Sequence, residues 1–88
     1  MKTIELKNGL KFEMNENTMD NMELVDTLAE AADDDPLAVS RMTKLVLGMG
    51  GRKKLYDSLR TEDGRVPVAA VSDAIKEIFE AFGEKGKN

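Results

Sequence analysis

Residues 55–82 read LYDSLRTEDGRVPVAAVSDAIKEIFEAF and decide how the second half of this chain folds. The stretch is typical of a helix end, a polar turn at residues 61–64 and a second amphipathic helix. We expect this second helix to pack against Leu55 and Leu59 across the turn, with Ile75, Ile78 and Phe79 in the core. Its apolar side chains keep helical spacing without interruption: Val68, Val71, Ile75, Ile78, Phe79 and Phe82.

The start of this helix has two readings. Pro67 suits the first helical position, because a proline there loses no hydrogen bond. Ser72 is the alternative cap if residues 66–68 are extended.

The turn has the outline of a calcium-binding EF-hand loop without its ligands. With Gly64 at the glycine of that loop, the first ligand position falls on Leu59 and the bidentate glutamate position on Ala70. Asp63 alone stands where a carboxylate is needed. Because calcium takes roughly six to eight oxygen ligands, we expect a structural loop and no metal site.

Composition restricts the chemistry that this chain could perform. Its 88 residues contain no cysteine and no histidine, so disulfides, thiolate metal sites and Ser-His or Cys-His nucleophiles are excluded. We expect no enzyme activity and no cofactor. The net charge of −4 argues against nucleic acid as the main partner.

Length and hydropathy give the expected organisation and location. We expect a single domain over residues 1–83 and a frayed tail over residues 84–88, which contain no apolar side chain. The N-terminus has no apolar signal region, and no run approaches the ~20 apolar residues of a membrane span. These features predict a cytosolic protein without a membrane partner.

Residues 2–14 predict a β-hairpin, because apolar and polar residues alternate on both sides of Asn8-Gly9. Asn-Gly suits a type I′ turn with two positive φ angles. An isolated hairpin is marginally stable in water, so it must lie on helices or pair with another sheet. The inward residues are expected to be Ile4, Leu6, Leu10, Phe12 and Met14.

A change to helical spacing after residues 15–17 predicts a first helix capped by Thr18. Its apolar stripe is expected to contain Met22, Val25, Leu28, Ala29 and Ala32. Asp33, Asp34 and Asp35 then separate two helices. Three consecutive carboxylates cannot converge on one ion, so we interpret them as capping groups, with Pro36 in the first turn of the next helix.

Two further helical segments follow. The first carries a stripe of Ala38, Met42, Leu45, Val46 and Met49, residues 48–51 break it, and residues 52–59 form the second. The sequence therefore predicts a mainly α protein of the α+β class, a hairpin followed by about four helical segments, with no strand between Asp20 and Leu47.

The sequence GMGGRKK at residues 48–54 resembles a phosphate-binding loop only in its glycines. A P-loop follows a buried strand and ends in Lys-Ser or Lys-Thr, whereas here a helix precedes the glycines and Leu55 follows Lys54. We interpret the segment as a flexible connection and a solvated basic first turn.

Six methionines are notable in so short a chain. The flexible thioether suits surfaces that repack around partners, and it also fills cores. We place a candidate partner-binding surface at Met42, Leu45, Val46 and Met49, beside the glycine-rich segment, and add Tyr56 as a residue at the core edge or an interface. Core filling is the default interpretation of the stripe, and a partner groove is the other.

With these elements placed, the chain resembles the small tail assembly chaperones of long-tailed bacteriophages and prophages. The resemblance covers most of the chain: the hairpin with Asn8-Gly9, an acidic helical middle, then LVLG at residues 45–48, KLYDSLR at 54–60, EDGRVPV at 62–68 and IKEIF at 75–79. It implies a non-enzymatic host-cytoplasmic protein, absent from the mature virion, that keeps the tape measure protein soluble while tail tube subunits polymerise around it.

The resemblance also implies a longer product made by −1 frameshifting. Gly86-Lys87-Asn88 can be encoded with the slippery heptamer A-AAA-AAC, although lysine and asparagine are also common in polar tails.

We expect binding of amphipathic helical segments in a groove. Two other classes stay open: a nucleic-acid-associated regulator using Arg52, Lys53 and Lys54, and a structural head–tail component. A homo-oligomer is compatible with the sequence.

Overall fold

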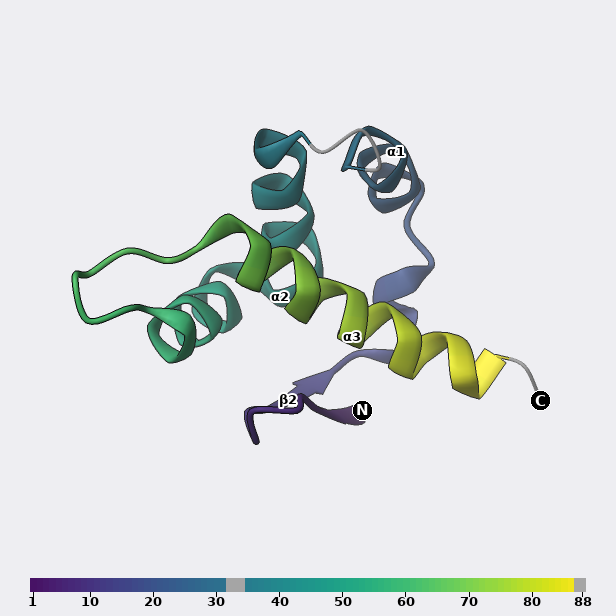
Figure 1. Ribbon diagram of the computed structural model, residues 1–88. Coiled ribbons are helices and arrows are strands. Elements are labelled where there is room, and N and C mark those ends of the chain that lie inside the picture. The colour runs from purple at the N-terminus through teal and green to yellow at the C-terminus, as the bar shows by residue number, and fades with distance from the viewer. Residues whose placement is uncertain (32–34, 87–88) are drawn as a thin grey trace.

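The computed structural model describes residues 1–31 and 35–86 and has an N-terminal hairpin followed by helices (Figure 1). The hairpin strands are β1 (Lys2–Glu5) and β2 (Lys11–Met14). A short 3-10 helix, η1 (Glu16–Met19), precedes α1 (Met22–Ala31), α2 (Pro36–Leu59) and α3 (Val68–Gly86). The mainly α, α+β class is confirmed, with three α-helices in place of about four helical segments, and no strand occurs in the described parts of residues 20–47.

The hairpin is antiparallel, and Ile4 is paired with Phe12. Its turn differs from the expected two-residue type. Gly9 N–H donates to Leu6 C=O over 2.8 Å, which centres the turn on Lys7 and Asn8, and Gly9 follows with φ +90°. A turn followed by a glycine in this conformation is the three-residue hairpin connection, and the Asn8 side chain supports it by accepting from Leu10 N–H.

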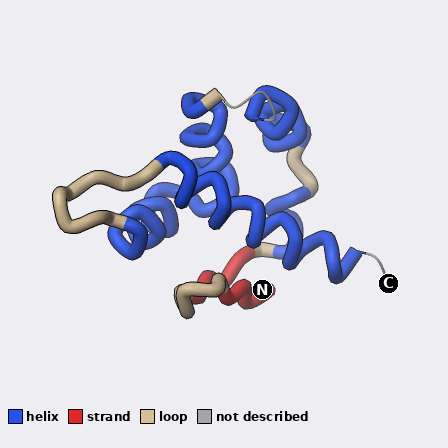
Figure 2. The backbone as a smooth tube through the Cα atoms, in the orientation of Figure 1, coloured by secondary structure: helices blue, strands red, loops and turns tan. Residues whose placement is uncertain are grey.

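The hairpin lies against α3, as Figure 2 shows with its two red strands beside that helix. Lys7 N–H at the hairpin turn donates to Glu77 Oε1 of α3 over 2.9 Å. The expected inward face is confirmed: Ile4, Leu6, Phe12 and Met14 are buried, and Leu10 is partly buried against them. The helices thus supply the packing surface that a lone hairpin needs.

Helix α1 begins after the predicted cap at Thr18, and the side of the helix that it buries is not the one that carries its apolar stripe. Asn21 caps it by accepting from Glu23 N–H, while Thr18 lies in η1, whose cap is Asn15. The buried side chains of α1 are Leu24 and Thr27. Met22, Val25 and Leu28 of the expected apolar stripe are exposed. Ala32, Asp33 and Asp34 lie outside the described residues.

Helix α2 begins as predicted, with the Asp35 carboxylate accepting from Leu37 N–H over 3.0 Å and Pro36 in the first turn. Gly48 (φ 70°, ψ 179°) interrupts it and bends the helix, so the two predicted segments are two halves of one bent element. The break is narrower than the predicted residues 48–51, since Gly50 and Gly51 are helical.

We expect Gly48→Ala to lower the free energy of unfolding by about 1–3 kcal/mol, because φ and ψ at Gly48 are nearly restricted to glycine. A Cβ there would meet no atom within 4 Å, so the cost is one of backbone conformation alone. Gly50 is helical and equally open, and Gly50→Ala is the matched control, with an expected gain of up to about 1 kcal/mol. Urea denaturation of both variants measures the difference between their free energies of unfolding. Equal changes in the two variants would contradict the bend at Gly48.

Helix α3 starts at Val68, and Val71 N–H donates to Pro67 C=O over 3.2 Å. The helix therefore starts directly after Pro67, and the alternative cap at Ser72 does not occur. Because α3 continues to Gly86 and residues 87–88 lie outside the described part, the division into a domain over residues 1–83 and a frayed tail over residues 84–88 stays a prediction.

The core lies between the hairpin, the inner sides of α1 and α2, and α3. Leu55 and Ile78 are fully buried and Ile75 nearly so, which confirms the predicted packing across the turn. Phe79 was expected in the core but is only partly buried, because it lies at the margin of α3's inner face. The main cluster of buried apolar residues contains Ile4, Leu6, Phe12, Met14, Leu24, Val39, Met42, Val46, Leu55, Val71, Ala74, Ile75 and Ile78.

Candidate functional site

The predicted partner surface on α2 is divided between the core and solvent. Met42 and Val46 are buried, Leu45 is partly buried and Met49 is exposed. Tyr56 is partly buried, with the Arg52 guanidinium 5.8 Å from its ring centroid. The structure therefore favours core filling for Met42 and Val46 and does not present the stripe as one surface, while the binding role of these residues stays a hypothesis.

The loop after α2 is held by its own polar groups. Thr61 N–H donates to Arg65 C=O over 2.7 Å, and Gly64 has φ +89°. Asp63 accepts a hydrogen bond from Thr61 Oγ1, and its Oδ2 lies 2.9 Å from the Arg65 guanidinium. Both contacts lower the pKa of the Asp63 carboxyl below its ordinary value. Asp63 is thus engaged within the loop, and the described residues contain no group of three or more carboxylates that could hold a metal.

The basic residues at the start of α2's second half contact this chain's own groups. Lys53 pairs with Asp57 over 2.9 Å, and this hydrogen bond together with Arg60 lowers the pKa of the Asp57 carboxyl. The Lys54 ammonium lies 4.9 Å from the Phe12 ring centroid and donates to Lys11 C=O. These contacts tie α2 to the hairpin and do not require a phosphate ligand.

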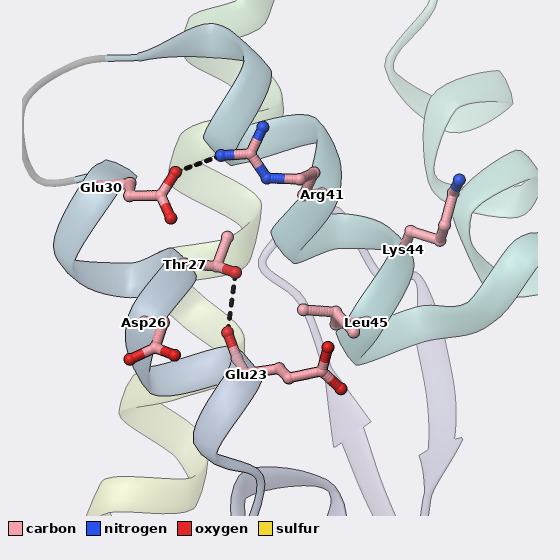
Figure 3. Close-up of a pocket in the computed structure, with 7 residues that line it drawn as sticks. All are labelled: Glu23, Asp26, Thr27, Glu30, Arg41, Lys44 and Leu45. Carbon is pink, nitrogen blue, oxygen red and sulfur yellow. Dashed lines mark hydrogen bonds and ion pairs between the residues drawn. The ribbon is translucent and has the colours of Figure 1, made fainter.

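A polar pocket of about 430 Å³ lies between α1 and α2 (Figure 3). Arg41 of α2 forms an ion pair with Glu30 of α1, and Thr27 Oγ1 donates to Glu23 C=O over 2.8 Å. Both ion-pair partners are about half exposed, so their contribution to stability is small. We interpret this pocket as the seam that orients α1 on α2, because the ion pair between Arg41 and Glu30 joins its two walls.

An apolar groove of about 310 Å³ lies between α1 and the C-terminal part of α3. Its outer walls belong to Val25 and Leu28 of α1 and to Phe79 and Phe82 of α3, and both phenylalanines are only partly buried. Leu24 forms part of the groove and continues into the core. We call these residues, together with Met19 of η1, the α1–α3 groove.

The groove is extended by apolar side chains that face solvent. Met22 is 71% exposed, Val25 50% and Leu28 45%. Helical spacing places Met22 and Val25 on one side of α1, beside the groove, so the exposed apolar residues form one continuous surface. Contiguous apolar surface of this kind marks interaction sites on soluble proteins.

The sequence contained a signal for this surface that the periodicity obscured. The apolar residues of α1 at helical spacing include Met22, Val25 and Leu28. This spacing is equally typical of a stripe buried in the core and of a stripe that binds a partner. Leu24 and Thr27 form a second, inner stripe, and α1 is therefore apolar over more of its circumference than packing against one neighbour needs. The spacing therefore identifies these residues without showing which side of α1 faces solvent.

Charge is unevenly distributed along the chain. Residues 12–40, which include η1, α1 and the start of α2, contain nine aspartates and glutamates and no lysine or arginine. The other residues carry all 13 basic side chains and eight acidic ones. Among the described acidic residues of η1 and α1, Glu16, Glu23, Asp26 and Glu30 are exposed, as is Asp20 between these helices. Glu23, Asp26 and Glu30 line the polar pocket between α1 and α2, together with Arg41 and Lys44, so these carboxylates lie on the side of α1 that faces α2 and not in the groove.

None of the described helices is both long enough and apolar enough to cross a membrane. Comparisons with protein-family models, with curated proteins and with solved structures find no match to this chain.

Proposed function

We propose that this protein is a non-enzymatic tail assembly chaperone of a long-tailed bacteriophage or prophage. Its client is the tape measure protein, which it holds soluble in the host cytoplasm while tail tube subunits are recruited. The protein leaves before the virion is complete. The observation that carries the proposal is the α1–α3 groove, because a small domain that leaves a continuous apolar surface exposed is suited to binding another chain.

The chemistry of the chain supports a binding role over a catalytic one. Without histidine or cysteine it lacks the commonest general base and the strongest nucleophile, and its polar pocket contains an ion pair in place of a catalytic arrangement. The resemblance of residues 45–48, 54–60, 62–68 and 75–79 to tail assembly chaperones gives the client class. Binding of an apolar client segment in the groove would shield it from aggregation, and the negative net charge would keep the complex dispersed.

Co-expression with the tape measure protein encoded by the same genome tests this function. We expect the wild-type chain to keep the tape measure protein in the soluble fraction and to co-purify with it. Val25→Asp should abolish both effects, because it places a carboxylate on the apolar wall of the groove. Val68→Asp is the matched control, since Val68 has a similar exposure (56% against 50%) and lies outside the groove.

The comparison is valid only if both variants keep the wild-type circular dichroism spectrum and melting temperature, which their exposure predicts. A tape measure protein that is equally soluble with and without this chain would contradict the chaperone function. Stoichiometric amounts of the protein in purified particles would favour the structural head–tail role.

A further inference from the structure

We propose that the bend at Gly48 is a hinge, and that α2 straightens there to let two copies of this chain exchange their C-terminal parts. In the exchanged dimer, residues 49–86 of each copy pack against residues 1–47 of the other. The inference goes beyond the proposed function and does not depend on it, because its test needs only the purified chain.

A single residue separates the bent helix from a straight one. Figure 1 shows the two halves of α2 running in different directions, and the residues on both sides of Gly48 are helical. Gly48 has φ 70° and ψ 179°, a region nearly restricted to glycine, whereas a helix needs about −63° and −42°. Changing this one pair of angles converts α2 into a continuous helix of 24 residues, about 36 Å long.

A second glycine is also specific for the bent form. A Cβ at Gly51 would lie 2.9 Å from the Cβ of Leu47, which is closer than side chains approach one another. In a continuous α-helix the Cβ atoms of residues four apart are separated by about 5–6 Å, so Gly51→Ala is compatible with the straight form. Gly50 differs, because a Cβ there would meet no atom within 4 Å. Alanine in place of Gly48 or Gly51 therefore favours the straight helix, and alanine in place of Gly50 favours neither form.

The bend is held by contacts on either side of it and not by packing at the hinge itself. An open pocket of about 470 Å³ lies beside the bend, between the hairpin and Gly48, Gly50 and Gly51. A Cβ at Gly48 would meet no atom within 4 Å. A hinge residue with free space around it can change its backbone angles without displacing neighbouring side chains.

The contacts that hold the bent form connect residues before the hinge with residues after it. Lys7 N–H donates to Glu77 Oε1 over 2.9 Å, and the Lys54 ammonium lies 4.9 Å from the Phe12 ring centroid. The core cluster is shared in the same way: it contains Ile4, Leu6, Phe12, Met42 and Val46 from before the hinge and Leu55, Ile75 and Ile78 from after it.

Straightening α2 moves its second half and α3 out of these positions, because every residue after Gly48 rotates when the angles of Gly48 change. A second copy restores the contacts, since the same residues then meet between two chains and no new contact surface is required. Domain swapping of this kind is a low-cost route to a dimer. The wild type favours the monomer at low concentration, because the two parts of one chain meet at an effective concentration on the order of a millimolar.

Analytical ultracentrifugation of chains refolded from urea tests the exchange. Gly48→Ala should lower the dimer dissociation constant roughly thirtyfold or more, because the unfavourable angles are removed from both chains. Gly51→Ala should change it in the same direction. Gly50→Ala is the matched control, and its dissociation constant should stay within about threefold of the wild-type value. At about 200 µM, Gly48→Ala should be largely dimeric and the control largely monomeric.

A cross-link shows whether the C-terminal parts have been exchanged. The chain has no cysteine, so Lys7→Cys and Glu77→Cys can be placed in separate copies of the Gly48→Ala chain. These two residues are in contact in the monomer. When the copies are unfolded and refolded together, a short bismaleimide should join them into a dimer band on a denaturing gel. The same two cysteines in one otherwise wild-type chain should give a link within the monomer.

The loss of stability predicted above for Gly48→Ala belongs to the monomer and is measured at low concentration, where the dimer dissociates. Folded monomers of both Gly48→Ala and Gly51→Ala at about 200 µM would overturn the proposal, as would equal dimerisation of Gly50→Ala. So would loss of the helical circular dichroism signal of Gly48→Ala at that concentration, because a straight form of comparable stability would keep the chain folded. A dimer without the cross-linked band would mean that unexchanged copies associate, and it too would overturn the proposal.

Discussion

Met42→Asp is expected to unfold the protein. Met42 is 5% exposed and lies among the core residues of α2, next to Val46. A carboxylate there would lose its hydration without gaining a partner, since no buried cation is present among the described core residues. The penalty of several kcal/mol approaches the whole stability of a small domain, which is about 5–15 kcal/mol.

Far-UV circular dichroism and a thermal melt check this result. The spectrum of Met42→Asp should lose helical signal at 25 °C, and the cooperative transition should disappear. Met49→Asp is the control, because Met49 belongs to the same sequence stripe but is 61% exposed, and its stability should change by no more than about 0.5 kcal/mol. A folded Met42→Asp protein would mean that Met42 faces solvent, as the partner-surface hypothesis for α2 requires.

Ile78→Ala should lower the free energy of unfolding by about 2–5 kcal/mol. Ile78 is fully buried in α3, and the change removes buried methyl groups and leaves a cavity between α3 and the rest of the core. Urea denaturation with an unchanged m-value measures the loss. Ile78→Val, which removes a single methylene, should lower the free energy of unfolding by about 0.5–1.5 kcal/mol. It is the smaller change against which the loss in Ile78→Ala is compared.

The neighbouring residue provides the contrast. Phe79 is only partly buried and borders the groove, so Phe79→Ala should cost less stability than Ile78→Ala although it removes the larger side chain. A greater loss for Phe79→Ala would mean that the inner face of α3 is rotated from the one described. In that case the groove would lack one of its walls.

The sequence predicted those parts of the fold in which local signals agree. Alternation predicted the hairpin and its inward residues, Asp35-Pro36 predicted the start of α2, and uninterrupted spacing predicted the inner residues of α3. Each of these segments has one apolar face and a recognisable turn or cap. The prediction of helix starts failed where several side chains could cap, as with Thr18, Asn15 and Asn21 in one polar stretch.

Buried threonines explain much of what the pattern missed. Thr27 and Thr43 are buried, and their hydroxyls donate to the carbonyls of Glu23 and Val39 over 2.8 Å. A threonine satisfied within its own helix can occupy the core, but it counts as polar when periodicity is read from sequence. With Thr27 counted as polar, the spacing of α1 shows the outer stripe of Met22, Val25 and Leu28 and does not show the inner one.

The position of the hairpin determines when this chain can finish folding. Its strands form from residues 2–14, but they close against α3: Lys7 N–H bonds to Glu77, and Lys2 lies over Phe82. These contacts join residues 70 or more positions apart, whereas α1 and α2 are consecutive and pack on each other. During synthesis, the part of the hairpin's apolar face that α3 covers therefore stays exposed until this helix leaves the ribosome.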